Sequence, residues 1–185
     1  GQICPVLLGS AERANGIFRL LKALRHEAPF VDATAKRLGV EDTPSAAYVF
    51  KSVHTAHGGK LSLTRILTGE IPDGATVIGP DGEDRIGGIS SLLGQETRKR
   101  QGAKAGDTVA LGRLDHIKTG DTISLDKNGA PQIETPPPPQ PVYGVALALK
   151  DRKDEVKLST ALGKLVEEDA SLSIEQNTDT HQLVL

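Results

Sequence analysis

The middle of the chain, residues 46–134, is dominated by short hydrophobic or alternating runs that are separated by turn residues. Turn sequences such as Pro72-Asp73-Gly74 and Thr119-Gly120-Asp121 recur between the runs. Many short strands at this spacing predict an antiparallel barrel or sandwich. Six strands are predicted, at residues 47–53, 61–67, 75–78, 86–92, 108–111 and 122–125.

The first part of the chain, residues 1–29, has a different pattern. The continuous apolar run at residues 3–8 predicts a strand buried on both faces of a parallel sheet. After a turn, Asn15-Gly16 precedes apolar residues at helical spacing, and Pro29 should end that helix. We expect a strand–loop–helix unit from the edge of an α/β domain. Residues 30–45 are weakly patterned and are predicted to be a linker.

The last part of the chain begins with a proline-rich spacer at residues 135–141, which should be stiff and extended. Residues 142–149 alternate as a strand, and Asp154 is placed to cap a helix with an apolar stripe. Asn177-Thr178-Asp179 then marks a hairpin. Strand–helix–strand–strand over 142–185 predicts a truncated ferredoxin-like α+β domain.

The amino-acid composition limits the kind of core and the kinds of partner that we expect, but it does not indicate a reaction. The 185 residues are 37% hydrophobic but only 3% aromatic, so the core must rest on Val, Ile, Leu and Ala. The formal net charge of -2 excludes a globally basic nucleic-acid binder and leaves a local basic patch open. The single cysteine, Cys4, cannot form an internal disulfide, and we expect a buried thiol in a reducing compartment.

Targeting signals and chain ends also bear on the class. No apolar run approaches the roughly 20 residues of a membrane-spanning helix, and the opening does not fit a signal peptide. We therefore expect a cytoplasmic protein that does not bind membranes. The chain contains no methionine and begins and ends inside apolar runs, which predicts that it is a piece of a longer protein.

Four stretches resemble elongation factor G in their order and spacing. They are residues 5–11 (PVLLGSA), residues 49–51 with 59–69 (VFK, GKLSLTRILTG), residues 120–122 (GDT), and residues 140–142 with 161–169 (QPV, ALGKLVEED). The resemblance implies the end of a GTPase domain, then domain II, a six-stranded Greek-key β-barrel of the translation-factor type, then part of domain III. The linker after Pro29, a shortened loop after Leu93 and the sequence His54-Thr55-Ala56-His57 depart from the family pattern and suggest a divergent paralogue.

The resemblance also implies a partial guanine site. In the family, the alanine N–H of a Ser-Ala turn meets the guanine carbonyl while the serine braces the loop, and the matching residues are Ser10 and Ala11. The longer parent would bind GTP and Mg²⁺. This chain contains neither Gly-x-x-x-x-Gly-Lys-Ser/Thr nor Asn-Lys-x-Asp, so we expect it to bind no cofactor and to hydrolyse no GTP.

Basic residues of the predicted barrel are candidate contacts to ribosomal RNA. The densest run is Arg98-Lys99-Arg100, with Lys104 close by, and the corresponding barrel loop of the family faces the small ribosomal subunit. Lys and Arg suit phosphate because they supply charge and, for Arg, a forked donor. The alternative is a solvated loop without function. Lys60 and Arg65 carry the same two interpretations, and for Arg65 we favour a role in organising the barrel loop.

Two other polar segments are weaker candidates for functional sites than the basic residues. His54 and His57 lie three residues apart, but no third ligand is evident, so we expect an exposed turn and no metal site. Glu167-Glu168-Asp169 ends the last predicted helix, where negative charge is unfavourable. We expect a solvated helix end there rather than a catalytic carboxylate pair, and no residue is assigned a catalytic role.

The function hypothesis is a monomeric fragment of an elongation factor G-like translational GTPase. Its barrel would dock on small-subunit ribosomal RNA, not DNA, during translocation or a related step. The alternatives are a ribosomal protection factor of the tetracycline-resistance type and a free-standing β-barrel binding module. A phosphate-binding loop encoded upstream of Gly1 would separate the last from the other two.

Overall fold

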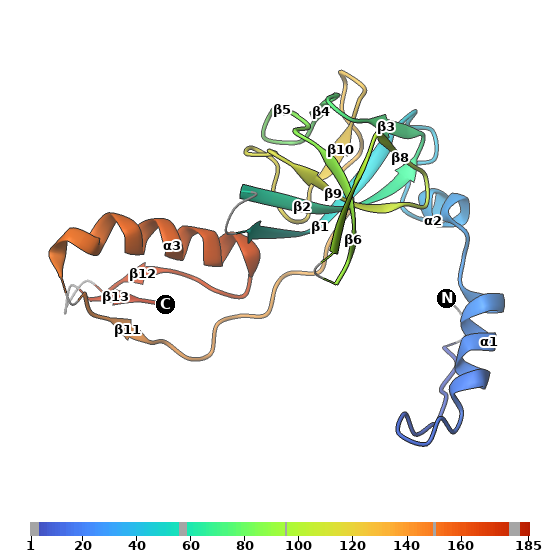
Figure 1. The fold of residues 1–185 in the computed structure, drawn as a ribbon, viewed down its shortest axis with the longest axis horizontal. Coiled ribbons are helices and arrows are strands. Elements are labelled where there is room, and N and C mark those ends of the chain that lie inside the picture. The colour runs from blue at the N-terminus through green and yellow to red at the C-terminus, as the bar shows by residue number, and fades with distance from the viewer. Residues whose placement is uncertain (1–3, 56–58, 95, 150, 178–181) are drawn as a thin grey trace.

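The computed structural model describes residues 4–55, 59–94, 96–149, 151–177 and 182–185 (Figure 1). Ten strands lie between residues 46 and 124, and all their pairings are antiparallel. Eight of them form one sheet in the order β5-β4-β10-β1-β2-β9-β6-β7, and β3 pairs with β8. The strands are β1 (Ala46–Thr55), β2 (Gly59–Thr68), β3 (Glu70–Pro72), β4 (Thr76–Ile78), β5 (Glu83–Arg85), β6 (Ile89–Leu93), β7 (Glu96–Arg100), β8 (Gly102–Lys104), β9 (Thr108–Gly112) and β10 (Thr122–Ser124).

The prediction of a mainly β, antiparallel fold is confirmed. Each of the six predicted runs contains a strand, and the structure adds four short ones: β3, β5, β7 and β8. Strands far apart in sequence lie side by side in the sheet, because β1 pairs with both β2 and β10 while β9 returns beside β2. We refer to residues 46–124 as the β domain.

The interior of the β domain is built from aliphatic side chains, as the low aromatic content requires. A bulge in β1 preserves this arrangement: the pairing with β2 shifts between Val49 and Lys51, so that Phe50 is the extra residue and points outward. The core residues are Ala47, Val49, Ile66, Ile71, Val77, Ile86, Ile89, Ala103, Val109, Leu111, Leu114, Ile117 and Ile123.

The segment before the β domain is more ordered than a plain linker. Residues 31–37 form a short helix, α2 (Val31–Arg37), that packs on β2. Ala35 and Val40 are buried with Ala46 and Leu67 in a second, smaller apolar cluster. Gly69 makes the close approach to this segment possible, since it has a φ of 64° and a Cβ there would meet the Pro44 carbonyl oxygen at 2.0 Å.

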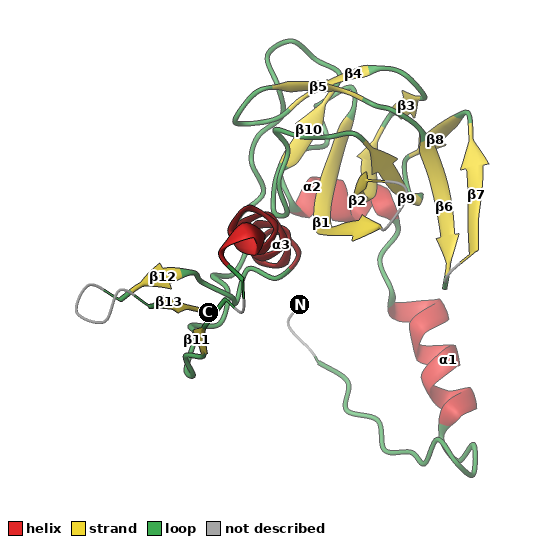
Figure 2. Cartoon of the chain, turned by 60° about the vertical axis from the view of Figure 1, so that its left-hand side comes forward, coloured by secondary structure: helices red, strands yellow, loops and turns green. Residues whose placement is uncertain are grey.

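The N-terminal part confirms one predicted element and contradicts another. Helix α1 (Ile17–Glu27) forms where the apolar spacing predicted it. Residues 4–9, however, form no strand and are exposed, because none of the described strands pairs with them. The expectation of a buried Cys4 is wrong for the same reason, since its side chain is exposed. Figure 2 shows α1 lying apart from the β domain.

The C-terminal unit consists of helix α3 (Glu155–Glu168), preceded by a 3-10 turn (Arg152–Asp154), and three two-residue strands: β11 (Ala146–Leu147), β12 (Glu175–Gln176) and β13 (Leu183–Val184). The strand order is β11-β13-β12, all antiparallel, and the predicted hairpin is the β12–β13 pair. Asp154 stands at the helix start, but its carboxylate accepts from Lys157 Nζ at 2.9 Å instead of capping the backbone.

Two further observations concern the described residues as a whole. Residues 135–141 contain neither helix nor strand, as expected of a proline-rich spacer. Among the described helices, none has the length and apolarity needed to cross a lipid bilayer.

Candidate functional site

The predicted basic loop is in fact an edge strand. Arg98, Lys99 and Arg100 lie in β7, the last strand of the large sheet, which pairs with β6 alone. The pairing runs from Ile89↔Arg100 to Leu93↔Glu96. The prediction of a loop was wrong because β7 (ETRKR) is polar on both faces and therefore shows no hydrophobic alternation.

The cations of this strand differ in how firmly the protein holds them. Arg98 lies 3.5 Å from the Glu96 carboxylate, and the Arg98 side chain is 79% exposed, so this ion pair is weak. Lys99 is exposed and has no ion-pair partner among the described residues. Within β7, Arg98 and Lys99 are therefore the cations most available to an external anion.

Arg100 and Lys104 are tied to a neighbouring turn. Arg100 Nη2 contacts Asp107 Oδ2 at 2.8 Å, and the same carboxylate oxygen accepts the backbone N–H of Lys104 at 2.9 Å. These two donors hold the pKa of Asp107 below its usual value. Lys104 Nζ itself is exposed and only 3.9 Å from Glu70. Arg100 thus has a structural partner, while the ammonium of Lys104 stays accessible.

Arg65 organises the turn that follows β8, in line with the interpretation favoured from the sequence. Its guanidinium donates to the Gly106 carbonyl and, at 3.2 Å, to Thr108 Oγ1. The Gly106 N–H in turn donates to the Ile66 carbonyl at 2.9 Å. The side chain is therefore engaged within the β domain.

Lys60 is placed unlike a surface RNA contact. Its side chain is only 6% exposed, and Nζ donates to the Ile117 carbonyl at 2.6 Å. It also forms an ion pair with Glu167 Oε1, from the last turn of α3. The proposed RNA contact through Lys60 would require this pair to open.

His54 and Glu167 correct two expectations. His54 is not in an exposed turn: it lies in β1 with a side chain 16% exposed, and its Nε2 is 2.7 Å from Glu167 Oε2. Its backbone N–H donates to Glu168. The acidic end of α3 is therefore docked on the β domain and is not freely solvated. His57 lies outside the described residues.

The ionisation of Glu167 reflects this docking. Burial disfavours its charged form, but hydrogen bonds from Lys60 and His54 and the charges of these residues outweigh burial and hold the pKa of Glu167 below its usual value. We call His54, Lys60, Glu167 and Glu168 the junction cluster. Sequence patterns gave no signal for it, because His54 and Glu167 are 113 residues apart.

A second polar site that the sequence did not reveal lies between β5 and the loop after Leu114. The buried carboxylate of Asp84 accepts the N–H groups of His116 at 2.8 Å and Ile117 at 3.2 Å, and it contacts His116 Nδ1 at 2.9 Å. This hydrogen bond and the negative charge of Asp84 raise the pKa of His116 above its usual value. The side chain of His116 is 66% exposed, so we interpret Asp84 as a structural cap of the loop.

The predicted guanine-side residues lie in a turn before α1. Ser10 pairs with Asn15 as an isolated bridge, its N–H donating to the Asn15 carbonyl at 3.0 Å. Ala11 is exposed, and its carbonyl accepts the Ala14 N–H at 3.2 Å. The turn is formed, while its role in nucleotide binding stays a prediction.

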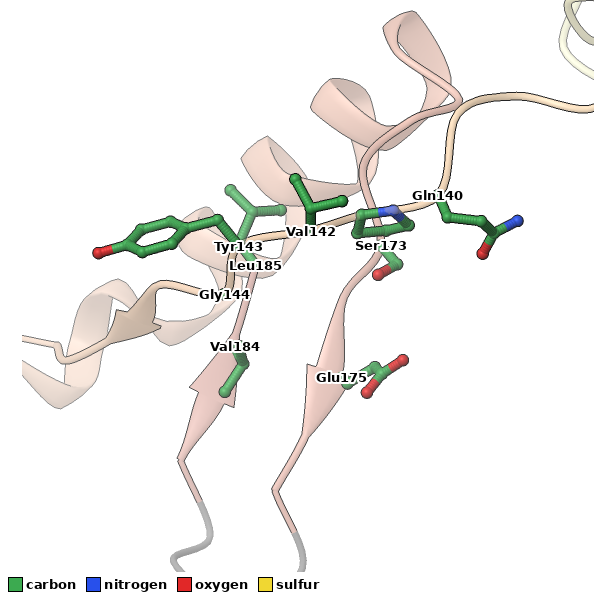
Figure 3. A pocket seen from close by; sticks show the side chains of 9 residues that line it. Gln140, Val142, Tyr143, Gly144, Ser173, Glu175, Val184 and Leu185 are labelled. Carbon is green, nitrogen blue, oxygen red and sulfur yellow. The ribbon is translucent and has the colours of Figure 1, made fainter.

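A shallow groove in the C-terminal unit is less informative chemically. Figure 3 shows it between the extended segment at residues 140–144 and strands β12 and β13. Val142 and Tyr143 are largely exposed there, and Glu175 is the only ionisable carboxylate among its lining side chains. Among the described residues, no group of three His, Cys, Asp or Glu side chains could hold a metal ion.

Family models identify both folded parts of the chain. The model "Elongation factor G domain 2" matches residues 44–126, and "Elongation Factor G, domain III" matches residues 138–185. The chain belongs to the elongation factor G family. The β domain is thus domain II of this family, and the C-terminal unit is part of domain III.

Individual relatives agree with this assignment. The chain is 45% identical over 187 residues to an "Elongation factor G-like protein" of Synechocystis sp., covering 99% of this chain. It is 37% identical to a protein of the same description from Mycobacterium tuberculosis, covering 78% of the chain. It spans only 27% and 22% of the length of these two relatives.

A solved structure shows that the arrangement extends beyond single domains. A crystal structure of a protein from Thermus thermophilus superposes with a TM-score of 0.77 and 27% identity, covering 96% of this chain and 26% of that one. This elongation factor G family chain therefore shares its fold with that protein over nearly its whole length.

Proposed function

We propose that this chain supplies the domain II surface through which a longer translational GTPase contacts the RNA of the small ribosomal subunit. The observation that carries the proposal is the exposure of Arg98 and Lys99 on edge strand β7, with the Lys104 ammonium nearby. Exposed cations without firm internal partners can exchange solvent for phosphate at little cost.

The competing explanation is that β7 is charged only to protect a sheet edge. An edge strand presents unpaired backbone groups, and charged side chains keep it from pairing with other chains. Three carboxylates, Glu70, Glu96 and Asp107, also lie beside the basic residues and reduce the local positive potential. Binding through this surface alone should therefore be weak and sensitive to salt.

A paired substitution separates the two explanations. Arg98→Ala with Lys99→Ala removes the two most exposed cations of β7, while Lys153→Ala with Lys157→Ala removes two exposed lysines from the domain III unit. A fluorophore on the exposed Cys4 reports binding to purified small ribosomal subunits by anisotropy. If both cations contact phosphates, the slope of log affinity against log salt should fall by about 2, roughly one per lost contact.

The control pair should leave both affinity and salt slope as in the unmodified chain. If the Arg98/Lys99 variant does the same, β7 is charged only to protect the edge and the RNA proposal is wrong. Circular dichroism should confirm that both variants keep the fold, since exposed charges typically change stability by no more than ~0.5 kcal/mol each.

We further propose that the longer protein works as a monomer in the cytoplasm and binds GTP with Mg²⁺, with Ser10 and Ala11 on the guanine side. The support is family membership together with the formed turn at these two residues. Phosphoryl transfer depends on a phosphate cradle and a magnesium ligand, and the sequence motifs for these are not in this chain. Magnesium-dependent GTP turnover by the purified chain, above a mock preparation, would contradict its assignment as an inactive segment.

A further inference from the structure

The last turn of α3 meets domain II through two carboxylates, and one of them, Glu167, contacts side chains from two strands. Glu167 accepts from Lys60 Nζ of β2 through one oxygen and contacts His54 Nε2 of β1 through the other. Glu168 adds a contact to the His54 backbone N–H. Figure 1 shows this end of α3 beside β1, while the rest of the helix extends away from the β domain.

From this geometry we infer that Glu167 is a latch that holds domain III against domain II and that can open to let domain III reorient. The latch is a conformational device of the chain itself and does not depend on the proposed RNA contact. Opening it would also uncover Lys60 and His54, which the closed junction shields from solvent.

Domain II fixes the position of Lys60, the cation that Glu167 binds. The ammonium of Lys60 is fixed by the Ile117 carbonyl, and the neighbouring Ile117 N–H is itself held by Asp84. A buried ammonium that loses its only carboxylate partner is left as an uncompensated charge, which is strongly unfavourable. Glu167 is the carboxylate that neutralises Lys60 in this structure.

The carboxylates of the latch lie at the C-terminal end of α3, where negative charge is otherwise unfavourable. The C-terminus of a helix carries partial negative charge, so two consecutive carboxylates there destabilise an isolated helix. The cations of domain II offset this repulsion when α3 docks. More distant positive charges, Lys118 near Glu167 and Lys51 near Asp169, act in the same direction.

Little apolar packing fixes the orientation of α3, so we expect these polar contacts to determine it. Leu162 is the one residue of this helix that is buried. Of its other large apolar side chains, Val156 and Leu165 are 77% and 44% exposed, and Leu158 and Val166 are partly buried. Without a broad apolar interface, loss of the latch should change the position of the helix more than its existence.

The test measures the separation of the two domains directly. Spin labels are attached to cysteines introduced at Thr76 in β4 and Lys164 in α3, both exposed, after Cys4→Ser. Pulsed electron spin resonance then gives the distribution of distances between them in the full chain. The variants are Glu167→Gln and, as a matched control, Glu155→Gln at the opposite end of the same helix.

We expect the unmodified chain and the Glu155→Gln control to give one narrow distance peak and Glu167→Gln to give a broad distribution. An unchanged narrow peak in Glu167→Gln would overturn the latch. If Glu167→Gln loses the circular dichroism of the β domain, His54→Phe decides, because it keeps the Lys60–Glu167 pair and removes one contact. Broadening in His54→Phe supports the latch, and a peak as narrow as in the unmodified chain rejects it.

Discussion

Domain II and helix α1 contain similar apolar side chains but bury them to very different extents. In domain II the aliphatic side chains of opposing strands fill a continuous core, and Leu111 and Ile66 are completely buried. In α1 the apolar stripe is just as regular, yet none of its residues is buried, and Leu21 and Leu24 are each 55% exposed. An amphipathic pattern predicts a helix, but it stabilises the protein only where a partner surface covers it.

Helix α3 lies between these two extremes. Its stripe buries only Leu162, and its last turn is fixed by the charged junction cluster. The comparison therefore teaches that stability in this chain is concentrated in domain II, while the flanking helices depend on surfaces or charges that adjoin them. The following predictions test that division, beginning with the largest expected effect.

Truncating a leucine should separate the two regions most clearly. Leu111→Ala in β9 creates a cavity in the core and should lower the free energy of unfolding by about 3 kcal/mol. Leu24→Ala in α1 removes the same atoms from an exposed site and should change the free energy of unfolding by less than ~0.5 kcal/mol. Urea unfolding followed by circular dichroism measures both, since the chain contains no tryptophan. Equal losses would show that α1 is packed as firmly as β9.

Removing an aspartate should also lower the stability more in domain II than at an exposed helix end, by less than the loss expected for Leu111→Ala. Asp84→Ala leaves the backbone N–H groups of His116 and Ile117 without their carboxylate in a buried loop, which should cost about 2 kcal/mol. The matched change, Asp169→Ala, removes a carboxylate that accepts from Ser171 at an exposed helix end, and its loss should be much smaller. Urea midpoints of the two variants, compared with the unmodified chain, decide this. A larger loss in Asp169→Ala would reverse the ranking.

The smallest expected effect is a pH dependence confined to domain II. Because Asp84 raises the pKa of His116 above 6.5 in the folded state, protonated His116 favours folding. This contribution is complete below pH 6.5 and is lost as the pH rises through the raised pKa. The melting temperature should therefore decline between about pH 6 and about pH 8 by more in the unmodified chain than in His116→Gln. Parallel curves would mean that His116 does not couple to folding.

The β strands that carry the core could be predicted from sequence because they are apolar or alternating runs bounded by turn residues. Strands β1, β2, β9 and β10 all have buried side chains on one face at least. The missed strands β5 and β7 are polar, and their position follows from pairing with neighbours rather than from their own pattern. The apolar run at residues 4–8 shows the reverse error, since its composition favours a strand but nothing described pairs with it.

The candidate sites were less predictable than the fold. Arg65 could be assigned to the barrel loop because the resemblance placed it in a known motif. The environment of Lys60 depends on Glu167, and that of His116 depends on Asp84, each from a distant part of the chain. A local pattern cannot show that a charged residue is buried, because its partner is chosen by the tertiary fold.

The proline-rich segment that joins domain II to domain III has a consequence for the latch. Since the two halves of the junction cluster are covalently connected, closing the latch is an intramolecular event, and a linker whose length matches the span between two sites raises their effective concentration. An ion pair too weak to hold two separate proteins together can then keep a tethered helix docked for most of the time. The linker therefore acts together with the Glu167 carboxylate in setting how often domain III is free to move.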